Sequence, residues 1–148
     1  MNKMAAKRDS DGHVIIVQTK GDAQAILDQM PDGPYTLIGD ASELTANRKY
    51  RDCWRDDGEG GVEVDLDLAR ADKMAEIRAK RDDLLAKSDA VYIEELSKAL
   101  DTTDVQADKT ALRDMTGTAQ TAVDAIEDAD ELEAYDAFAG LSLNKEYE

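Results

Sequence analysis

Two Asp- and Gly-containing segments, DSDG and DDGEG, are the first places where this sequence could hold a metal ion. A calcium-binding EF-hand loop needs an acidic first ligand, a glycine at its sixth position and an acidic residue at its twelfth. Placing Gly12 at the sixth position makes Lys7 the first residue and Gln18 the last. The second segment fails in the same way at both ends. We therefore predict no metal site.

The nucleophiles and bases of the chain show no catalytic pattern either. The only histidine, His13, abuts an expected strand, and no nucleophile is placed to use it as a base. The only cysteine, Cys53, has no second cysteine at metal-ligand spacing, and we expect it to be a buried apolar residue. The glycines at 58–61 precede a strand and open no helix, so they form no phosphate loop. We predict a protein that is not an enzyme and uses no cofactor.

A cluster of aromatic and basic residues, KYRDCWR, holds the only tryptophan of the chain. In a strand, alternate residues share a face, so Tyr50 and Trp54 would lie together, with Arg51 and Arg55 opposite. One interpretation makes Trp54 a core anchor between a sheet and the long helix, with the arginines facing outward. The other makes all four residues a docking patch for a protein partner, because Trp, Tyr and Arg are enriched at interface hot spots.

Residues 1–66 are expected to form a small α+β head that positions this cluster. Apolar, β-branched runs bounded by glycine and aspartate are typical of strands, and an aspartate before a short apolar period is typical of a helix start. The expected elements are strands at 13–20 and 34–40, a short helix between them capped by Asp22 and ended by Pro31, and a hairpin that pairs 50–54 with 62–66.

Residues 67–148 are expected to form an acidic helical arm that begins with a long helix capped by Asp65 or Asp67. Neither Pro nor Gly interrupts positions 66–100. Apolar residues recur there at helical spacing, which indicates one buried face. The residues of this face that we expect to be buried by later helices, by a second copy or by a partner are Met74, Ile77, Leu84, Val91 and Tyr92.

Shorter helices should follow the long one. TGT is expected to break the chain between a helix at 104–115 and another around 122–126. Asp128 or Asp130 should cap a last helix, with Leu132, Tyr135 and Phe138 facing inward. These helices offer few large side chains, so part of the long helix should need cover from another molecule.

The net charge of −16 lies entirely in the arm. Residues 1–55 hold eight basic and eight acidic residues, whereas residues 56–148 hold ten basic and twenty-six acidic ones. Such an arm repels nucleic acid and anionic membranes, so we predict neither as a partner. It either keeps the protein in solution or docks on a basic protein surface, and an acidic inhibitor that mimics DNA is a further alternative. No apolar run approaches the roughly 20 residues that span a bilayer, and the N-terminus does not resemble a signal peptide, so synthesis should occur in a cytoplasm.

The order of several short motifs resembles that in small tail-region proteins of tailed bacteriophages. The motifs are a PYxIV strand, an RxFRxAW strand, a VDMxKAR helix start and an IRxxR helix, which correspond here to Pro34–Ile38, Arg48–Trp54, Val64–Arg70 and Ile77–Arg81. The following RDDLLAKSDA and ALRDM are similar to the C-terminal part of phage tail and tail fibre assembly proteins. The two tryptophans and the Tyr-Arg pair of that pattern are missing here.

The resemblance implies a non-enzymatic tail protein, made in the host cytoplasm and kept in the virion. The leading expectation is a structural or adaptor protein that links a fibre or baseplate element to the tail. Its partners would be other phage tail or fibre proteins, with a homo-oligomer as a further possibility. The alternative is a transient tail or tail fibre assembly chaperone.

Overall fold

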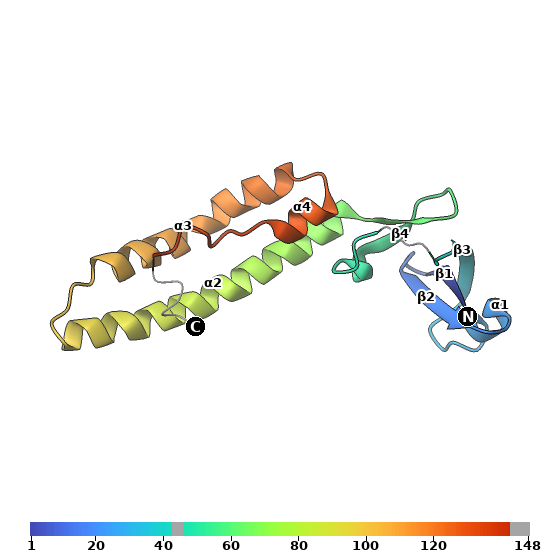
Figure 1. Cartoon of the computed structure of the whole chain (residues 1–148), viewed down its shortest axis with the longest axis horizontal. Coiled ribbons are helices and arrows are strands. Elements are labelled where there is room, and N and C mark those ends of the chain that lie inside the picture. The colour runs from blue at the N-terminus through green and yellow to red at the C-terminus, as the bar shows by residue number, and fades with distance from the viewer. Residues whose placement is uncertain (43–45, 143–148) are drawn as a thin grey trace. The chain divides into compact units, whose positions relative to one another are not determined.

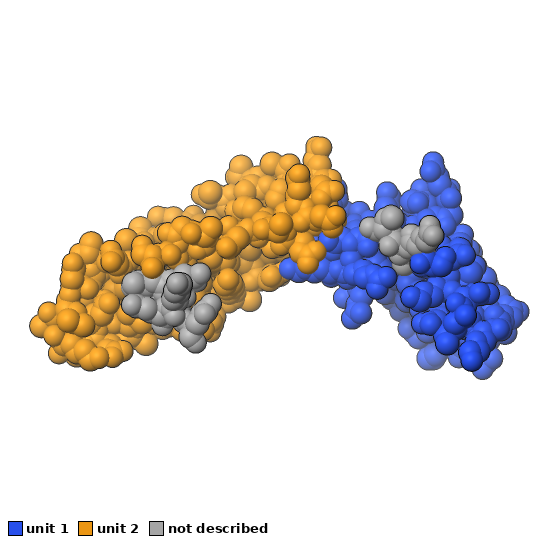
Figure 2. Space-filling model, in the orientation of Figure 1, with its two compact units in different colours: residues 1–69 blue, residues 70–148 orange. Residues whose placement is uncertain are grey.

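The computed structural model describes residues 1–42 and 46–142, and the chain divides into two compact units, 1–69 and 70–148 (Figure 2). The described strands all belong to the first unit, and the second is built from helices (Figure 1). The protein is therefore α+β, with a small sheet followed by a long helix and shorter ones, as the sequence predicted.

Three antiparallel strands form the main sheet of the first unit, in the order β2-β1-β3. They are β1 (Asn2–Arg8), β2 (Val14–Thr19) and β3 (Tyr35–Asp40). The two outer strands confirm predictions, but the central strand was missed. Its sequence, NKMAAKR, has no β-branched residue, and pairing along both edges rather than intrinsic propensity makes it a strand.

The two faces of this sheet are covered by different elements. On one face Ala6, Val17 and Tyr35 pack with α1 (Ala23–Leu27), whose start is capped as predicted by Asp22, which accepts a hydrogen bond from Gln24 N at 3.0 Å. On the other face Ala5, Val14 and Ala41 pack against Trp54. The small side chains of β1 let both layers approach the backbone closely.

A second, two-stranded sheet carries Trp54, and it differs from the predicted hairpin. Its strands are β4 (Trp54–Asp56) and β5 (Val62–Val64), with Trp54 opposite Val64. Residues Arg51–Cys53 form a 3₁₀ turn, so the prediction of a strand from 50 to 54 was wrong. The reason is burial: the turn brings Tyr50, Cys53 and Trp54 all into the interior, whereas a strand would point Cys53 away from the other two.

The long helix of the prediction is α2 (Leu66–Ser97). Asp65, one of the two predicted caps, accepts hydrogen bonds from the backbone N–H groups of Asp67 and Leu68 at 3.1 and 3.2 Å. The next helix, α3 (Thr103–Ala125), continues through Gly117, so the predicted break at TGT was wrong. A glycine in a helix interior costs only about 1 kcal/mol, which the packing of the surrounding helix offsets.

Side-chain contacts show that α2 and α3 pack antiparallel (Figure 1). The guanidinium of Arg70 reaches Ile126, that of Arg81 reaches Thr116, and Asp89 pairs with Lys109 at 2.6 Å. The residue numbers of these contacts increase along α2 and decrease along α3, so the two helices run in opposite directions. Eight buried or half-buried residues of α2, which we call the seam, recur in alternating steps of four and three, the heptad spacing of a coiled coil. They are Arg70, Met74, Ile77, Arg81, Leu84, Ser88, Val91 and Glu95.

A short helix and an extended segment complete the second unit. The last helix, α4 (Ala129–Ala134), is capped by Asp128 as predicted, and Leu132 is buried. The chain then returns along the helical hairpin, where Phe138 is buried and Ser142 N donates a hydrogen bond to Asp108 Oδ1 at 3.0 Å. In the described part of the chain, no helix is long and apolar enough to span a membrane.

Candidate interaction surface

The predicted aromatic patch of the first unit is mostly interior. Tyr50 is buried, and Trp54 is only 6% exposed, with its Nε1 donating a hydrogen bond to Asn47 O at 3.0 Å. Arg51 is exposed, whereas Arg55 is half-buried and donates from Nη1 to the carbonyl of Trp54 at 2.8 Å. The four residues therefore do not form one surface, which corrects the docking-patch interpretation. Trp54 anchors the core of this unit, where it packs against Ala5 and Val14 of the main sheet.

The predicted stripe of the second unit is also covered, over most of its length, by the chain itself. Met74, Ile77 and Leu84 are buried, because α3 is longer than predicted and the segment after α4 adds a further layer. Val91 and Tyr92 are half-buried, and the Tyr92 ring lies 4.8 Å from the Lys109 ammonium. Of the expected alternatives, burial by later helices therefore holds for Met74, Ile77 and Leu84.

Uncovered apolar surface lies further along, at the tip of the α2–α3 hairpin. Ile93, Leu96 and Leu100 are 66%, 59% and 57% exposed, respectively. Ile93 follows Val91 of the seam by two positions, which is about 200° around a helix, so it faces away from α3. Ile93 and Leu96 are three residues apart and lie on one side of α2, and Leu100 follows three residues after the end of the helix. We call Ile93, Leu96 and Leu100 the tip cluster.

The backbone at the tip holds this cluster in place. Leu100 N donates to Glu95 O at 2.9 Å, and Ala99 N donates to Leu96 O at 3.2 Å, which together make a Schellman motif at the end of α2. Ala99 has a φ of 56°, in the left-handed region that glycine usually fills. A residue with a Cβ is strained there, and such strain is tolerated where the surrounding structure fixes the conformation.

Acidic groups surround the tip cluster. Five acidic residues and one lysine lie between positions 89 and 104. Hydrogen bonds from Thr103 hold the pKa of Asp101 below its usual range, and Lys98 does the same for the pKa of Glu94. Both carboxylates therefore stay charged at neutral pH. One oxygen of Glu95, Oε2, is buried without a hydrogen-bond partner among the described residues.

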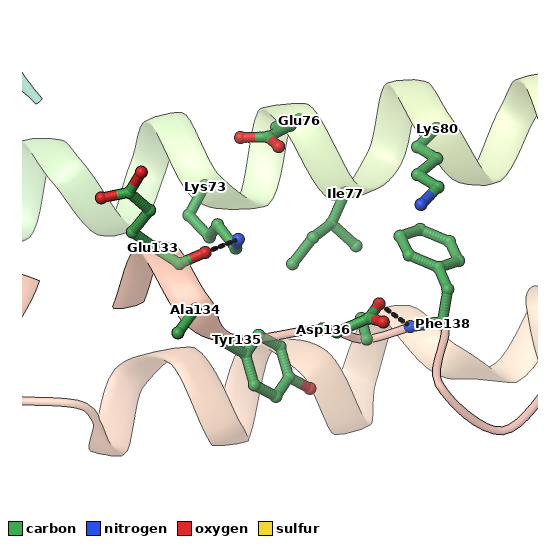
Figure 3. A pocket seen from close by; sticks show the side chains of 10 residues that line it. Lys73, Glu76, Ile77, Lys80, Glu133, Ala134, Tyr135, Asp136 and Phe138 are labelled. Carbon is green, nitrogen blue, oxygen red and sulfur yellow. Dashed lines mark hydrogen bonds between the residues drawn. The ribbon is translucent and has the colours of Figure 1, made fainter. Parts of the chain in front are cut away.

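A hollow of about 200 Å³ elsewhere in the second unit lies between α2 and the segment after α4 (Figure 3). Lys73 donates to the Glu133 carbonyl at 3.1 Å, at the end of α4, and the Lys80 ammonium lies 4.6 Å from the centre of the Phe138 ring. Both lysines thereby hold the C-terminal segment on α2. The hollow is smaller than the roughly 300 Å³ at which ligand pockets begin, and we assign it a structural role.

The residues with catalytic or metal-binding potential lie apart. His13 is half-buried beside the β1–β2 turn, where its backbone N–H donates to Asp11 Oδ1 at 3.0 Å. Cys53 is buried as expected. Residues 1–42 and 46–142 contain no group of three or more His, Cys, Asp or Glu side chains that could hold a metal ion.

The sequence does contain a signal for the tip cluster, although its three residues were not among those predicted to bind a partner. Ile93, Leu96 and Leu100 follow helical spacing, but they are out of phase with the stripe that runs through Met74 and Leu84. Two apolar phases on one helix indicate two covered faces, or one covered face and one binding face. Comparison of the chain with protein-family models, with curated proteins and with solved structures finds no match.

Proposed function

We propose that this protein is a non-enzymatic structural or adaptor component of a bacteriophage tail, which links a fibre or baseplate element to the tail through the tip of its helical hairpin. The observation that carries the proposal is the tip cluster. It consists of three large apolar side chains that are each more than half exposed. Exposed apolar side chains gathered on one side and rimmed by charge are typical of protein-binding sites.

The chemistry around the tip cluster indicates what kind of surface it fits. Charged groups at a rim select a partner of opposite sign and speed its approach. The excess of acidic residues between positions 89 and 104 therefore favours an apolar pocket edged by Lys or Arg.

The rest of the second unit is suited to presenting this tip. Charged contacts join α2 to α3 along the hairpin, from Arg70 near its base to Asp89 near its tip. Ser88 is fully buried in the seam, where its hydroxyl donates to Leu85 O at 2.8 Å. The contacts of Arg70, Arg81 and Asp89 with α3 fix the register of the two helices, which keeps the tip at a constant distance from the base.

The proposal is tested by replacing the tip cluster in virions purified by density gradient. Mass spectrometry should find the wild-type chain in the particles, and the variant Ile93→Ser/Leu96→Ser should be depleted from them at equal cellular abundance. The matched control is Ile26→Ser, because Ile26 is an apolar residue of the first unit that is 40% exposed. It should be incorporated normally.

Two other outcomes would change the assignment. If the wild-type chain is abundant in lysate but missing from particles, the protein is a transient assembly chaperone, which uses the tip on a client and then leaves. If the tip variant is incorporated as well as wild type, the tip cluster does not bind the tail and the proposal is wrong.

A further inference from the structure

The three-stranded sheet of the first unit has two outer edges that differ in regularity. At the β3 edge the register shifts beside Ala5 and Ala6, and the β4–β5 turn lies so close that a Cβ on Gly39 would collide with the Gly60 carbonyl. In contrast, β2 pairs with β1 over six residues without a shift. No strand in residues 1–42 and 46–142 pairs with the outer edge of β2.

The sequence of β2, VIIVQT, lacks three of the features that protect natural edge strands. It has no charged residue, no proline and no bulge. Proteins normally protect a free edge by one of these devices, because unpaired backbone groups are a template for another strand. An unprotected apolar edge of this length therefore indicates that a strand is meant to pair with it.

The hydrogen bonds of the β1–β2 ladder identify the backbone groups on this edge. Arg8 N donates to His13 O at 2.8 Å, so these two residues face each other through their backbone groups. Because such pairs alternate with non-bonded pairs in an antiparallel ladder, the N–H and C=O groups of Val14, Ile16 and Gln18 point outward. Gln18 is exposed and Ile16 is half-buried, whereas Val14 is only 2% exposed, so the accessible outward groups are those of Ile16 and Gln18.

A shallow pocket beside this edge has room for side chains of an added strand. Its volume is about 380 Å³, and it is lined by His13, Val14, Ile15, Ile16, Arg51, Asp52 and Trp54. Val14 and Ile16 belong to the face of the sheet that packs on Trp54. Every second side chain of an added strand would therefore lie over this pocket.

Charge decides which strand can occupy the edge. Residues 1–55 carry no net charge, whereas residues 70–148 hold ten basic and twenty acidic residues. Two copies that met through their helical units would bring like charges together, but two copies that met at β2 would not. The edge itself is uncharged from Val14 to Thr19, so self-pairing places no like charges opposite each other.

We propose that two copies of this chain pair antiparallel through their β2 edges, around a two-fold axis at Ile16. The product is a continuous six-stranded sheet in the order β3-β1-β2-β2-β1-β3. Outward residues must face outward residues for their backbone groups to bond, and Ile16 is the middle one of the three. Val14 then lies opposite Gln18 of the second copy, and Ile15 lies opposite Val17.

The ends of the paired strands are complementary in this register. Lys20 of the second copy lies opposite Gly12, beyond the end of β2 where Asp11 is located. It is on the same face of the sheet as Ile16, toward Asp52 of the pocket. A lysine thus approaches two aspartates at each end, and the symmetry makes both ends equal. The interface is independent of the tip cluster, so either proposal can fail without the other.

Sedimentation velocity and light scattering of the full chain test the pairing. Wild type should have twice the 16.2 kDa mass of one chain at micromolar concentration. Gln18→Pro should be monomeric with an unchanged circular dichroism spectrum, because proline is tolerated on an edge strand where its missing N–H would have faced solvent. Gln18→Ala keeps that N–H and should remain a dimer. A monomeric wild type, or a Gln18→Pro variant that stays dimeric, would overturn the proposal.

Cysteine cross-linking tests the register and does not depend on the proline variant folding. Ile16→Cys places two thiols at the two-fold axis, and mild oxidation should link the two chains. Gln18→Cys places the thiols about 13 Å apart along the strands at 3.4 Å per residue, so it should give no link. Wild type, whose single Cys53 is buried, should not link either. Cross-linking of Gln18→Cys in preference to Ile16→Cys would show that the register is wrong.

Discussion

The guanidinium of Arg70 donates two hydrogen bonds to the carbonyl oxygen of Ile126, from Nε at 3.2 Å and from Nη2 at 2.7 Å. Ile126 is the residue at which α3 ends, so its carbonyl belongs to the unsatisfied set at a helix C-terminus. The positive charge also meets the negative end of the helix dipole. One side chain thus fastens the end of α3 to α2.

Replacing Arg70 with Ala should lower the free energy of unfolding by about 1.5–3 kcal/mol, because hydrogen bonds that involve a charged group contribute about that much. Arg70→Lys should recover part of the loss, since an ammonium can reach the carbonyl but cannot bind it through two nitrogens. The control is Arg78→Ala, an exposed arginine on the same helix, which should change stability by less than about 0.5 kcal/mol. Urea denaturation measures all three, and equal losses for Arg70 and Arg78 would contradict the assignment.

Placing a charge in the seam should be far more damaging than placing it at the tip. Leu84 is buried, so Leu84→Asp should cost several kcal/mol through lost packing and an unpaired buried carboxylate. Ile93 is 66% exposed on the same helix, so Ile93→Asp should be nearly neutral. Thermal denaturation of the two variants provides the comparison. Similar midpoints would show that the two apolar phases of α2 have been assigned incorrectly.

Two substitutions of Trp54 separate its packing from its hydrogen bond. Trp54→Ala should cost roughly 3–5 kcal/mol, because it leaves a cavity between the main sheet and the β4–β5 hairpin. Trp54→Phe keeps much of the ring but loses the Nε1 donor, so the carbonyl of Asn47 loses this bond and the cost should be smaller. Chemical denaturation followed by circular dichroism measures both. If the Ala variant is as stable as wild type, Trp54 does not stabilise the core.

The ion pair between Arg8 and Asp11 should make stability depend on pH in acid. The side-chain hydrogen bond from Arg8, at 2.7 Å, holds the pKa of Asp11 well below its usual range. A carboxyl whose pKa is lowered by folding adds stability above its unfolded pKa of about 3.9, and this is lost as pH falls toward the folded value. Wild type should thus exceed Asp11→Asn in stability at pH 7, and the difference should shrink below about pH 4. A difference that is constant from pH 7 to pH 2.5 would contradict this coupling.

Opposite exchanges of glycine and alanine should each stabilise the second unit. Gly117 lies on an exposed turn of α3 with open space around it, so Gly117→Ala should add about 0.5–1 kcal/mol through helix propensity. Ala99 has a positive φ, so Ala99→Gly should add stability by relieving strain, by about 1 kcal/mol. The control is an alanine-to-glycine exchange inside the same helix. Ala111→Gly, at an exposed position of α3, should destabilise the protein by a similar amount. Thermal midpoints give the sign of each.

Local sequence signals were sufficient for the elements whose own residues determine them. β2 and β3 have apolar runs between turn residues, and Asp22, Asp65 and Asp128 are helix caps by their chemistry. β1 was missed because alanine does not favour strands by itself. Its two buried alanines stabilise the strand only by packing against the layers on either face of the sheet. The 3₁₀ turn at 51–53 was missed for a similar reason, since only the folded core shows that Tyr50, Cys53 and Trp54 must all point inward.

The candidate site was partly within reach of the sequence. The helical spacing of Ile93, Leu96 and Leu100 is visible, but their exposure depends on where α3 lies. The expected break at Gly117 shortened α3 in the prediction and left too much of α2 without cover. Because of this error, Met74 and Leu84 were predicted to be partner-binding residues, although α3 buries them, and the residues of the tip cluster were not.

The antiparallel hairpin determines which parts of the protein can fold while the ribosome is still synthesising the chain. The first unit, residues 1–69, has its full set of strands before the arm is synthesised. The seam of α2 is different, because the residues that cover it extend from Thr103 to Ser142. At about 5–20 residues per second, roughly 2 to 9 s separate the addition of Ser97 from that of Ser142. During this interval a nascent helix exposes Met74, Ile77 and Leu84 to solvent, and it is this intermediate, rather than the finished fold, that would engage general chaperones.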